Sequence, residues 1–210
     1  MRLQAVKAVH CRILRGQFKF ATRFAAFFAV FEEKLAGTMK IQICGYSGSG
    51  ISTLARALGE KYNIPVLHMD NVNWYGDWQY RSDEEKTEIV NKFLSENESW
   101  VIDGNYTAVS PERFSECDVF ILLLFNRFYC FKNCLSRYKR YKGRPRPDLP
   151  CGEKFDFEFA WWILHEGRIR KRKNKFKKFA ANAKSALVFR SPKAFKKWLK
   201  DEGIILDATK

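Results

Sequence analysis

The chain has 210 residues, of which 46% are hydrophobic and 29% are charged, so it can bury one sizeable core and is not compositionally disordered. Its net charge of +15 favours an anionic partner, which could be nucleotide phosphates, nucleic acid or a membrane surface. The six scattered cysteines lack the spacing of a secreted disulfide scaffold and favour reduced thiols, so we expect a cytoplasmic protein.

The first 38 residues differ from the rest, because no acidic residue occurs before Glu32. At helical spacing, basic side chains fall on one face and aromatic side chains on another, which predicts a basic amphipathic helix. These residues are Arg12, Arg15, Lys19 and Arg23 on the first face, and Phe20, Phe24, Phe27 and Phe31 on the second. The uncharged apolar run 24–31 is far shorter than the roughly 20 residues of a membrane span. We interpret residues 1–38 as an extension outside the native fold, with a transit-like peptide or a membrane-surface helix as the alternative.

From Met39 onward, the patterns of strand and helix alternate. Short apolar segments predict strands at 39–44, 65–70, 100–103, 118–125 and 186–190. The fourth segment is continuously apolar, as expected of a strand that is buried on both faces of a parallel sheet. Ser82 and Glu85 form a capping box that begins one helix, and Ser191 and Pro192 begin the last one. This order predicts a doubly wound α/β domain over 39–210, with ligands at the carboxyl ends of the strands.

The segment ICGYSGSGIST, residues 43–53, joins the first predicted strand to a helix. It matches the phosphate-binding pattern G-x-x-x-x-G-K-[ST] except that Ile51 stands where the lysine is expected. Backbone N–H groups of such a loop curl around an anion at a helix N-terminus. We therefore predict a nucleotide site formed by Gly45, Ser47, Gly48, Ser49, Gly50, Ile51, Ser52 and Thr53.

Two aspartates, Asp70 and Asp103, each end a predicted strand. In a phosphate loop of this kind, the Ser52 hydroxyl would bind Mg2+, and Asp103 would hold a water that is bound to the metal. Asp70 could orient or deprotonate an acceptor hydroxyl, with a turn-capping role as the alternative. Trp74 and Trp78 follow Asp70 and could either stack on the acceptor or pack in the core or a lid.

Segment 127–155 is rich in arginine and contains glycine and proline signals near its end, which predicts a mobile lid. Its arginines are Arg127, Arg137, Arg140, Arg144 and Arg146. Arginine forks suit the charge of a phosphoryl group, so we expect some of them, Arg144 included, to contact the nucleotide. Arg168 could also reach the phosphates, whereas the later lysines of the basic run 168–178 form a solvated helix face or a nucleic-acid patch.

Several of these motifs together resemble the bacterial DNA topology modulation proteins, which are related to adenylate kinase and other P-loop kinases. The motifs are MKIQICGYSGSG-ST, HMDNVNW, WVIDGNY, the arginine-rich segment and CGEKFDFEFAWWIL. The resemblance extends from about Met39 to the C-terminus and implies a three-layer P-loop kinase domain. Its five-stranded parallel sheet would have the order 2-3-1-4-5, with helices on both faces. The resemblance also implies ATP with Mg2+, phosphoryl transfer to a small acceptor, and lid contacts from Arg137 and Arg140.

Ile51 removes the cation that would bridge the β- and γ-phosphates of a bound nucleotide. The leading hypothesis is therefore a MgATP-dependent kinase with impaired transfer, whose acceptor is a nucleotide or another small molecule. The alternative is a nucleic-acid-binding regulator of DNA topology that uses the basic run 168–178. A third hypothesis is a fold that is kept only for interaction with other proteins.

Overall fold

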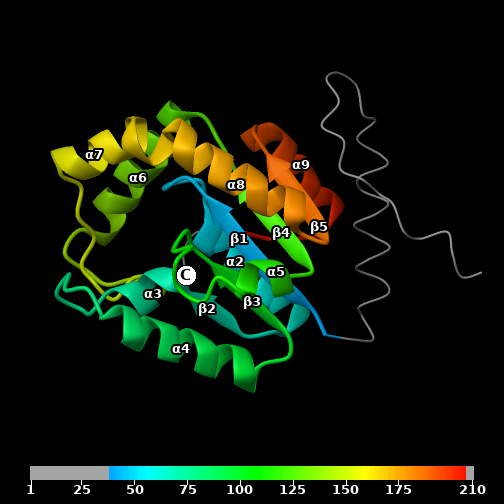
Figure 1. Ribbon diagram of the computed structural model, residues 1–210. Coiled ribbons are helices and arrows are strands. Elements are labelled where there is room, and N and C mark those ends of the chain that lie inside the picture. The colour runs from blue at the N-terminus through cyan, green and yellow to red at the C-terminus, as the bar shows by residue number, and fades with distance from the viewer. Residues whose placement is uncertain (1–37, 207–210) are drawn as a thin grey trace, which may run out of the picture. The chain divides into compact units, whose positions relative to one another are not determined.

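The centre of the protein is a sheet of five parallel strands in the order β2-β3-β1-β4-β5, as seen in the computed structural model (Figure 1). The strands are β1 Lys40–Gly45, β2 Val66–His68, β3 Trp100–Asp103, β4 Val119–Leu123 and β5 Ser185–Phe189. The structure describes residues 38–206, so the predicted basic amphipathic helix lies outside the described residues. The predicted α/β fold and its strand order are confirmed.

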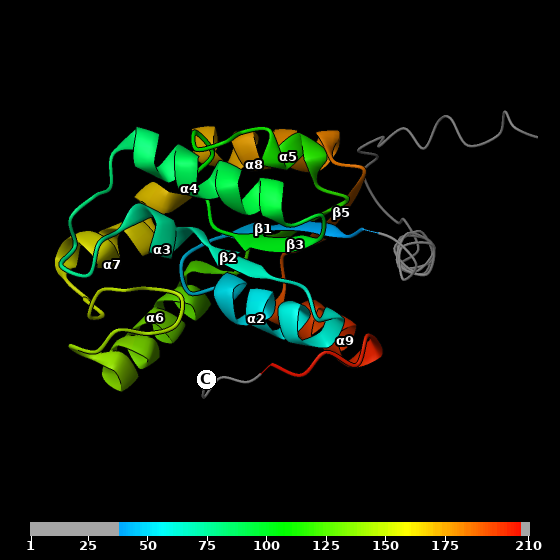
Figure 2. The ribbon, with the colours of Figure 1, turned by 90° about the horizontal axis from the view of Figure 1, so that it is seen from below.

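Helices cover both faces of the sheet and make a three-layer arrangement (Figure 2). The helices α2 Ile51–Tyr62 and α9 Pro192–Asp201 lie on one face, and α4 Asp83–Glu96, α5 Arg113–Glu116 and α8 Arg170–Asn182 lie on the other. The remaining elements are α3 Met69–Asn73, α6 Arg127–Tyr141, α7 Phe157–Leu164 and the 3-10 helix η1 Glu166–Arg168. Within residues 38–206, no helix has the length and apolar character that crossing a membrane requires.

The central strand β1 and its neighbours β3 and β4 form the most deeply buried part of the sheet. Every residue of β4 is buried, and the apolar side chains of β1 are at most 1% exposed. The amphipathic helix α9 adds Phe195, Trp198 and Leu199 to this core, with the Trp198 ring 5.1 Å from the ring of Phe189 in β5. Apolar burial on this scale fixes the strand ends, and the functional loops extend from those ends.

Local sequence signals set the helix starts as predicted. The Ser82 hydroxyl accepts a hydrogen bond from the Glu85 N–H, and the Glu85 carboxylate accepts one from the Ser82 N–H, which completes the capping box of α4. At the start of α9, Ser191 accepts from the Ala194 N–H and Pro192 occupies the first helical position.

The second strand is shorter than predicted, because β2 ends at His68 and α3 begins at Met69. β2 pairs with β3 alone among the described strands, and its last register pair joins His68 to Asp103, where β3 also ends. Because β3 ends at Asp103, it provides no strand partner for the residues after His68, and the chain continues as the helix α3. Asp70 therefore lies in the first turn of α3, where a carboxylate suits the helix dipole, and not at the end of a strand.

The predicted lid, 127–155, consists of a helix followed by an irregular segment. Its first part is the fifteen-residue helix α6, which begins at Arg127 and whose cap is Asn126. Only the segment after Tyr141, up to the start of α7, is irregular. We refer to residues 142–156 as the lid segment.

The glycine loop has no room for a side chain at Gly48. Gly48 has a φ of 77°, and a Cβ there would collide with the carbonyl oxygen of Cys130 and lie 2.6 Å from Cys134 Sγ. Gly143 has a similar φ of 67° but open space around it. Gly48→Ala should therefore lower the free energy of unfolding by about 1–3 kcal/mol more than Gly143→Ala. Urea unfolding of both variants measures this difference, and equal losses would contradict the close packing.

Candidate functional site

The glycine loop, Tyr46 to Gly50, connects β1 to α2 at the carboxyl end of the sheet. Gly50 is the N-cap of α2, with a φ of 92°, and no side chain caps the helix. The first-turn N–H groups, those of Ile51, Ser52 and Thr53, therefore point out of the helix without an intrahelical partner. This arrangement suits an anion, because free N–H groups and the positive end of the helix dipole coincide there.

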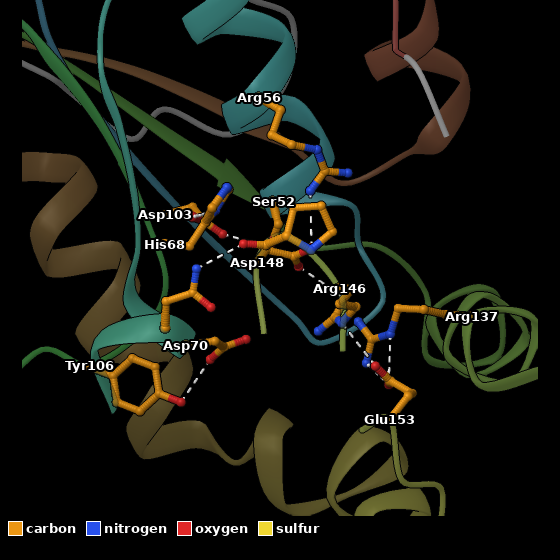
Figure 3. Close-up of polar contacts among 12 residues, drawn as sticks. Ser52, Arg56, His68, Asp70, Asp103, Tyr106, Arg137, Arg146, Asp148 and Glu153 are labelled. Carbon is orange, nitrogen blue, oxygen red and sulfur yellow. Dashed lines mark hydrogen bonds and ion pairs between the residues drawn. The ribbon is translucent and has the colours of Figure 1, made fainter. Parts of the chain in front are cut away.

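Ser52 and Asp103 meet at the base of this loop, as predicted for a magnesium site (Figure 3). The Ser52 hydroxyl donates a hydrogen bond of 2.7 Å to Asp103 Oδ2. The meeting follows from the sheet: β1 and β3 are neighbours and Ile43 is paired with Asp103, so the end of β3 lies beside the loop. Asp103 is 3% exposed. A hydroxyl and a carboxylate are the hard oxygen ligands that Mg2+ takes in nucleotide sites, so these two residues fit the ion.

His68 also contacts Asp103, with its Nδ1 2.5 Å from Asp103 Oδ1. Burial alone would lower the pKa of His68, but the hydrogen bond and the charge of Asp103 outweigh burial and raise it above 6.5. His68 was not among the residues predicted to form the site, although its position at the end of a predicted strand, before Met69 and Asp70, was a usable signal. The histidine holds the second oxygen of Asp103, which leaves Oδ2 directed at Ser52.

Asp70 lies on another wall of the site and accepts a hydrogen bond of 2.8 Å from the Tyr106 hydroxyl. Burial raises the pKa of Asp70, and the bond from Tyr106 only partly opposes that rise. Tyr106 belongs to the DGNY motif, and the preceding Asn105 exchanges two hydrogen bonds with the backbone of Gly45. The motif therefore links the carboxylate Asp70 to the glycine loop.

The lid segment is fastened to the site by buried ion pairs (Figure 3). Asp148 lies 3.0 Å from Arg56 of α2 and 2.9 Å from Arg146. Glu153 lies 2.9 Å from Arg146 and 2.6 Å from Arg137 of α6. The side chains of Arg146, Asp148 and Glu153 are 8%, 5% and 2% exposed. Burial alone would raise the pKa of Asp148, but Arg146 and Arg56 hold it below its ordinary value.

We call this cluster, Arg56, Asp148, Arg146, Glu153 and Arg137, the arginine–carboxylate network. Of its five members, the sequence analysis assigned a site role only to Arg137, and it named Arg146 only as a lid arginine. The carboxylates follow proline and glycine in PDLPCGE, a spacing that predicts a turn but not which arginines the turn will reach.

A cavity of about 1240 Å3 connects the glycine loop, Asp70 and the network. The predicted site residues that line it are Ser47, Gly48, Gly50, Ile51, Ser52, Thr53, Asp70, Arg137 and Arg140. Trp74, Trp78 and Tyr106 line it as well. Asp103, at the end of β3, and Ser49, in the glycine loop, are both buried and do not line the cavity.

Two of the predicted nucleotide contacts lie elsewhere. Arg144 is exposed in the lid segment and does not line the cavity. Arg168 donates hydrogen bonds of 2.9 Å to the Phe125 carbonyl and 2.7 Å to the Ile163 carbonyl, and its guanidinium lies 3.9 Å from the centre of the Tyr46 ring. Arg168 thus braces the glycine loop from a smaller neighbouring cavity of about 100 Å3, which Gly45 also lines.

Comparison with known proteins agrees with this fold. No protein-family profile matches the chain. The structure is similar to the shikimate kinase from Acinetobacter baumannii in complex with shikimate, with a TM-score of 0.54 and 13% sequence identity, over 81% of this chain and 97% of that one. An uncharacterized protein from Eubacterium ventriosum ATCC 27560 is 17% identical, with a TM-score of 0.45, over 78% of this chain and 98% of the other. The chain therefore has the P-loop kinase fold.

One curated relative is similar in sequence, the uncharacterized protein YqaC of Bacillus subtilis (strain 168). It is 36% identical over 69 residues, which are 30% of this chain and 36% of that protein. The chain thus spans about a third of the length of the curated relative that it matches. The resemblance to the topology modulation proteins stays a prediction, because neither the relative nor these similar structures bear that name.

The contact between His68 and Asp103 predicts how the histidine titrates. In the native protein the pKa of His68 should lie above 6.5, whereas in Asp103→Asn burial and the charge of Arg56 are opposed only by the charge of Asp148, so the pKa should fall. An NMR titration measures both values, with the His68 resonance assigned from a His68→Gln variant. A pKa that does not change on removal of the Asp103 charge would contradict the contact.

The network predicts a large cost for removing a single charge. Glu153→Gln removes the carboxylate partner of the partly buried Arg137 and one of the two partners of the buried Arg146 side chain, so the free energy of unfolding should fall by about 3 kcal/mol. The matched control Glu88→Gln removes an exposed carboxylate from α4 and should change it by less than about 0.5 kcal/mol. Equal effects in chemical unfolding would mean that the network does not hold the lid segment.

Proposed function

We propose that residues 39–210 form a nucleotide-binding, kinase-like domain that binds MgATP and transfers a phosphoryl group to a small acceptor. The observation that carries the proposal is the Ser52–Asp103 hydrogen bond beneath an uncapped helix N-terminus in a glycine loop. The N–H groups that would bind an anion belong to the first turn of α2, and the same turn carries Ser52, whose hydroxyl oxygen would bind magnesium together with Asp103. Residues 1–38 are proposed to be an extension outside this domain. The five free cysteines among the described residues support a cytoplasmic protein.

Each part of the site has a role in this proposal. The loop N–H groups bind the phosphate oxygens, and Ser52 with Asp103 holds the magnesium. The ion, when bound, neutralises charge that develops on the phosphates. Asp70 accepts the proton of the acceptor hydroxyl, and Tyr106 fixes the orientation of the Asp70 carboxylate. The raised pKa of Asp70 suits a group that must take up a proton.

Ile51 is the weak point of this site. It lines the cavity at the start of α2 with an apolar side chain where a lysine would contact phosphate. Arg137 and Arg146 also line the cavity, but both are engaged by Glu153. Either arginine can replace the missing charge only if its ion pair with Glu153 opens, so we propose slow transfer and weakened nucleotide binding.

The substitution Ile51→Lys tests the proposal. The lysine restores the cation beside the phosphates, so MgATP affinity should rise and the transfer rate should increase about 100- to 1000-fold. The matched control Ile51→Leu keeps the apolar character and should change neither quantity. Calorimetric titration with MgATP measures the affinity, and a screen of nucleosides, nucleotides and hydroxylated metabolites with radiolabelled ATP measures the transfer. No gain with the lysine variant, in affinity or in transfer, would contradict the proposal.

A further inference from the structure

A row of aromatic rings is exposed on α7, beside the mouth of the cavity. Phe157, Trp161 and His165 are four residues apart and therefore lie on one face of the helix. Phe157 is 81% exposed and Trp161 is 46% exposed. The Phe157 and Trp161 rings are stacked with an interplanar angle of 20°, and those of Trp161 and His165 with one of 24° at 4.1 Å. Rings with this exposure contribute little to the core and, although they stack on one another, leave apolar ring surface open to solvent.

The next helix, α8, carries the densest positive charge of the described residues. Its basic side chains are all exposed: Arg170, Lys171, Arg172, Lys173, Lys175, Lys177 and Lys178. No acidic residue occurs between Gly167 and Lys200, so no carboxylate from this part of the chain neutralises the positive charge. Phe176 is buried and Phe179 stacks on the buried Phe114, and these two rings anchor the helix in the core. A helix face stays in solvent with only a few charged side chains. The higher density of positive charge on α8 is typical of a surface that binds a polyanion.

The aromatic row and the basic helix belong to one surface. The short helix η1 joins α7 to α8, and the two helices follow one another in the fold (Figure 1). The Arg172 guanidinium lies 4.3 Å from the centre of the Trp162 ring, which ties the start of α8 to α7. Phe157, Trp161 and Arg172 all line the main cavity. The surface therefore runs from the mouth of the cavity onto the basic helix.

From this arrangement we infer that single-stranded nucleic acid binds across α7 and α8, with its bases on Phe157 and Trp161 and its phosphates on the cations of α8. Unpaired bases stack on aromatic side chains, and a positive groove follows the backbone; the two features together are typical of single-strand binding. A duplex offers phosphates but keeps its bases stacked inside, so it can use only the basic half of the surface.

A membrane surface is a less suitable partner for the same residues. The rings border a concave cavity, which a flexible strand can enter but a flat bilayer cannot. The carboxylates of Glu158 and Glu166 also lie in this region and would repel anionic headgroups next to the rings. For a nucleic acid they direct the phosphates away from α7 and toward α8, while the uncharged base faces remain on α7.

Fluorescence anisotropy with a labelled oligothymidylate of about 20 nucleotides tests the inference on the full chain. The native protein should bind it, and Trp161→Ala should weaken the affinity about 10-fold through the loss of one stacking contact. Phe128→Ala, which removes an exposed ring from α6, should leave the affinity unchanged. The double variant Lys171→Gln/Lys175→Gln, whose side chains are four residues apart on one face of α8, should reduce the slope of log affinity against log salt by about 1.4, with Lys196→Gln on α9 as the control.

A duplex of the same length should bind more weakly and should not respond to Trp161→Ala. Circular dichroism melting confirms that each variant is folded. The inference is overturned if single strand and duplex bind equally, or if Trp161→Ala has no effect on the strand. It is also overturned if Trp161→Ala reduces binding to phosphatidylserine vesicles but not to the oligonucleotide. None of these results depends on ATP, so they leave the proposed kinase function to its own test.

Discussion

The hydrogen bond between Ser52 and Asp103 is the contact on which the site depends. It forms because β1 and β3 are adjacent and parallel, so that a residue at the start of α2 and a residue at the end of β3 reach the same point. His68, at the end of β2, completes this alignment by occupying the other oxygen of Asp103. The carboxyl ends of three neighbouring strands thus converge on the Ser52–Asp103 pair, which we propose as the magnesium site, at the edge where open parallel sheets bind ligands.

The arginine–carboxylate network ties the lid segment to α2 and α6. Asp148 and Glu153 are anions from the lid segment that neutralise arginines facing the cavity. In a site without the loop lysine, these arginines are a source of positive charge within the cavity. In the proposed function, the same carboxylates would compete with a bound nucleotide for Arg137 and Arg146. This competition and Ile51 act in the same direction, toward weak binding.

Much of this could be predicted from the sequence, because it rests on local patterns. The glycine loop, the buried strands and the caps at Ser82 and Ser191 are encoded in neighbouring residues, and the meeting of Ser52 with Asp103 follows from parallel pairing. Features that depend on tertiary contacts could not be predicted from the sequence. Asp70 lies in a helix because the β2 ladder ends at His68. Arg168 donates its hydrogen bonds to backbone carbonyls and not to the cavity. The partners of Asp148 and Glu153 depend on how the lid segment folds back onto α2 and α6.

The central claim is that the glycine loop binds MgATP through Ser52 and Asp103. Calorimetric titration of the native protein and of Ser52→Ala with ATP, each with and without Mg2+, tests it most directly. We predict that the native protein binds ATP more tightly when Mg2+ is present, and that Ser52→Ala loses this dependence but keeps a weaker interaction through the loop N–H groups. Binding that is absent in the native protein at millimolar ATP, or that responds to Mg2+ equally in both proteins, would contradict the account.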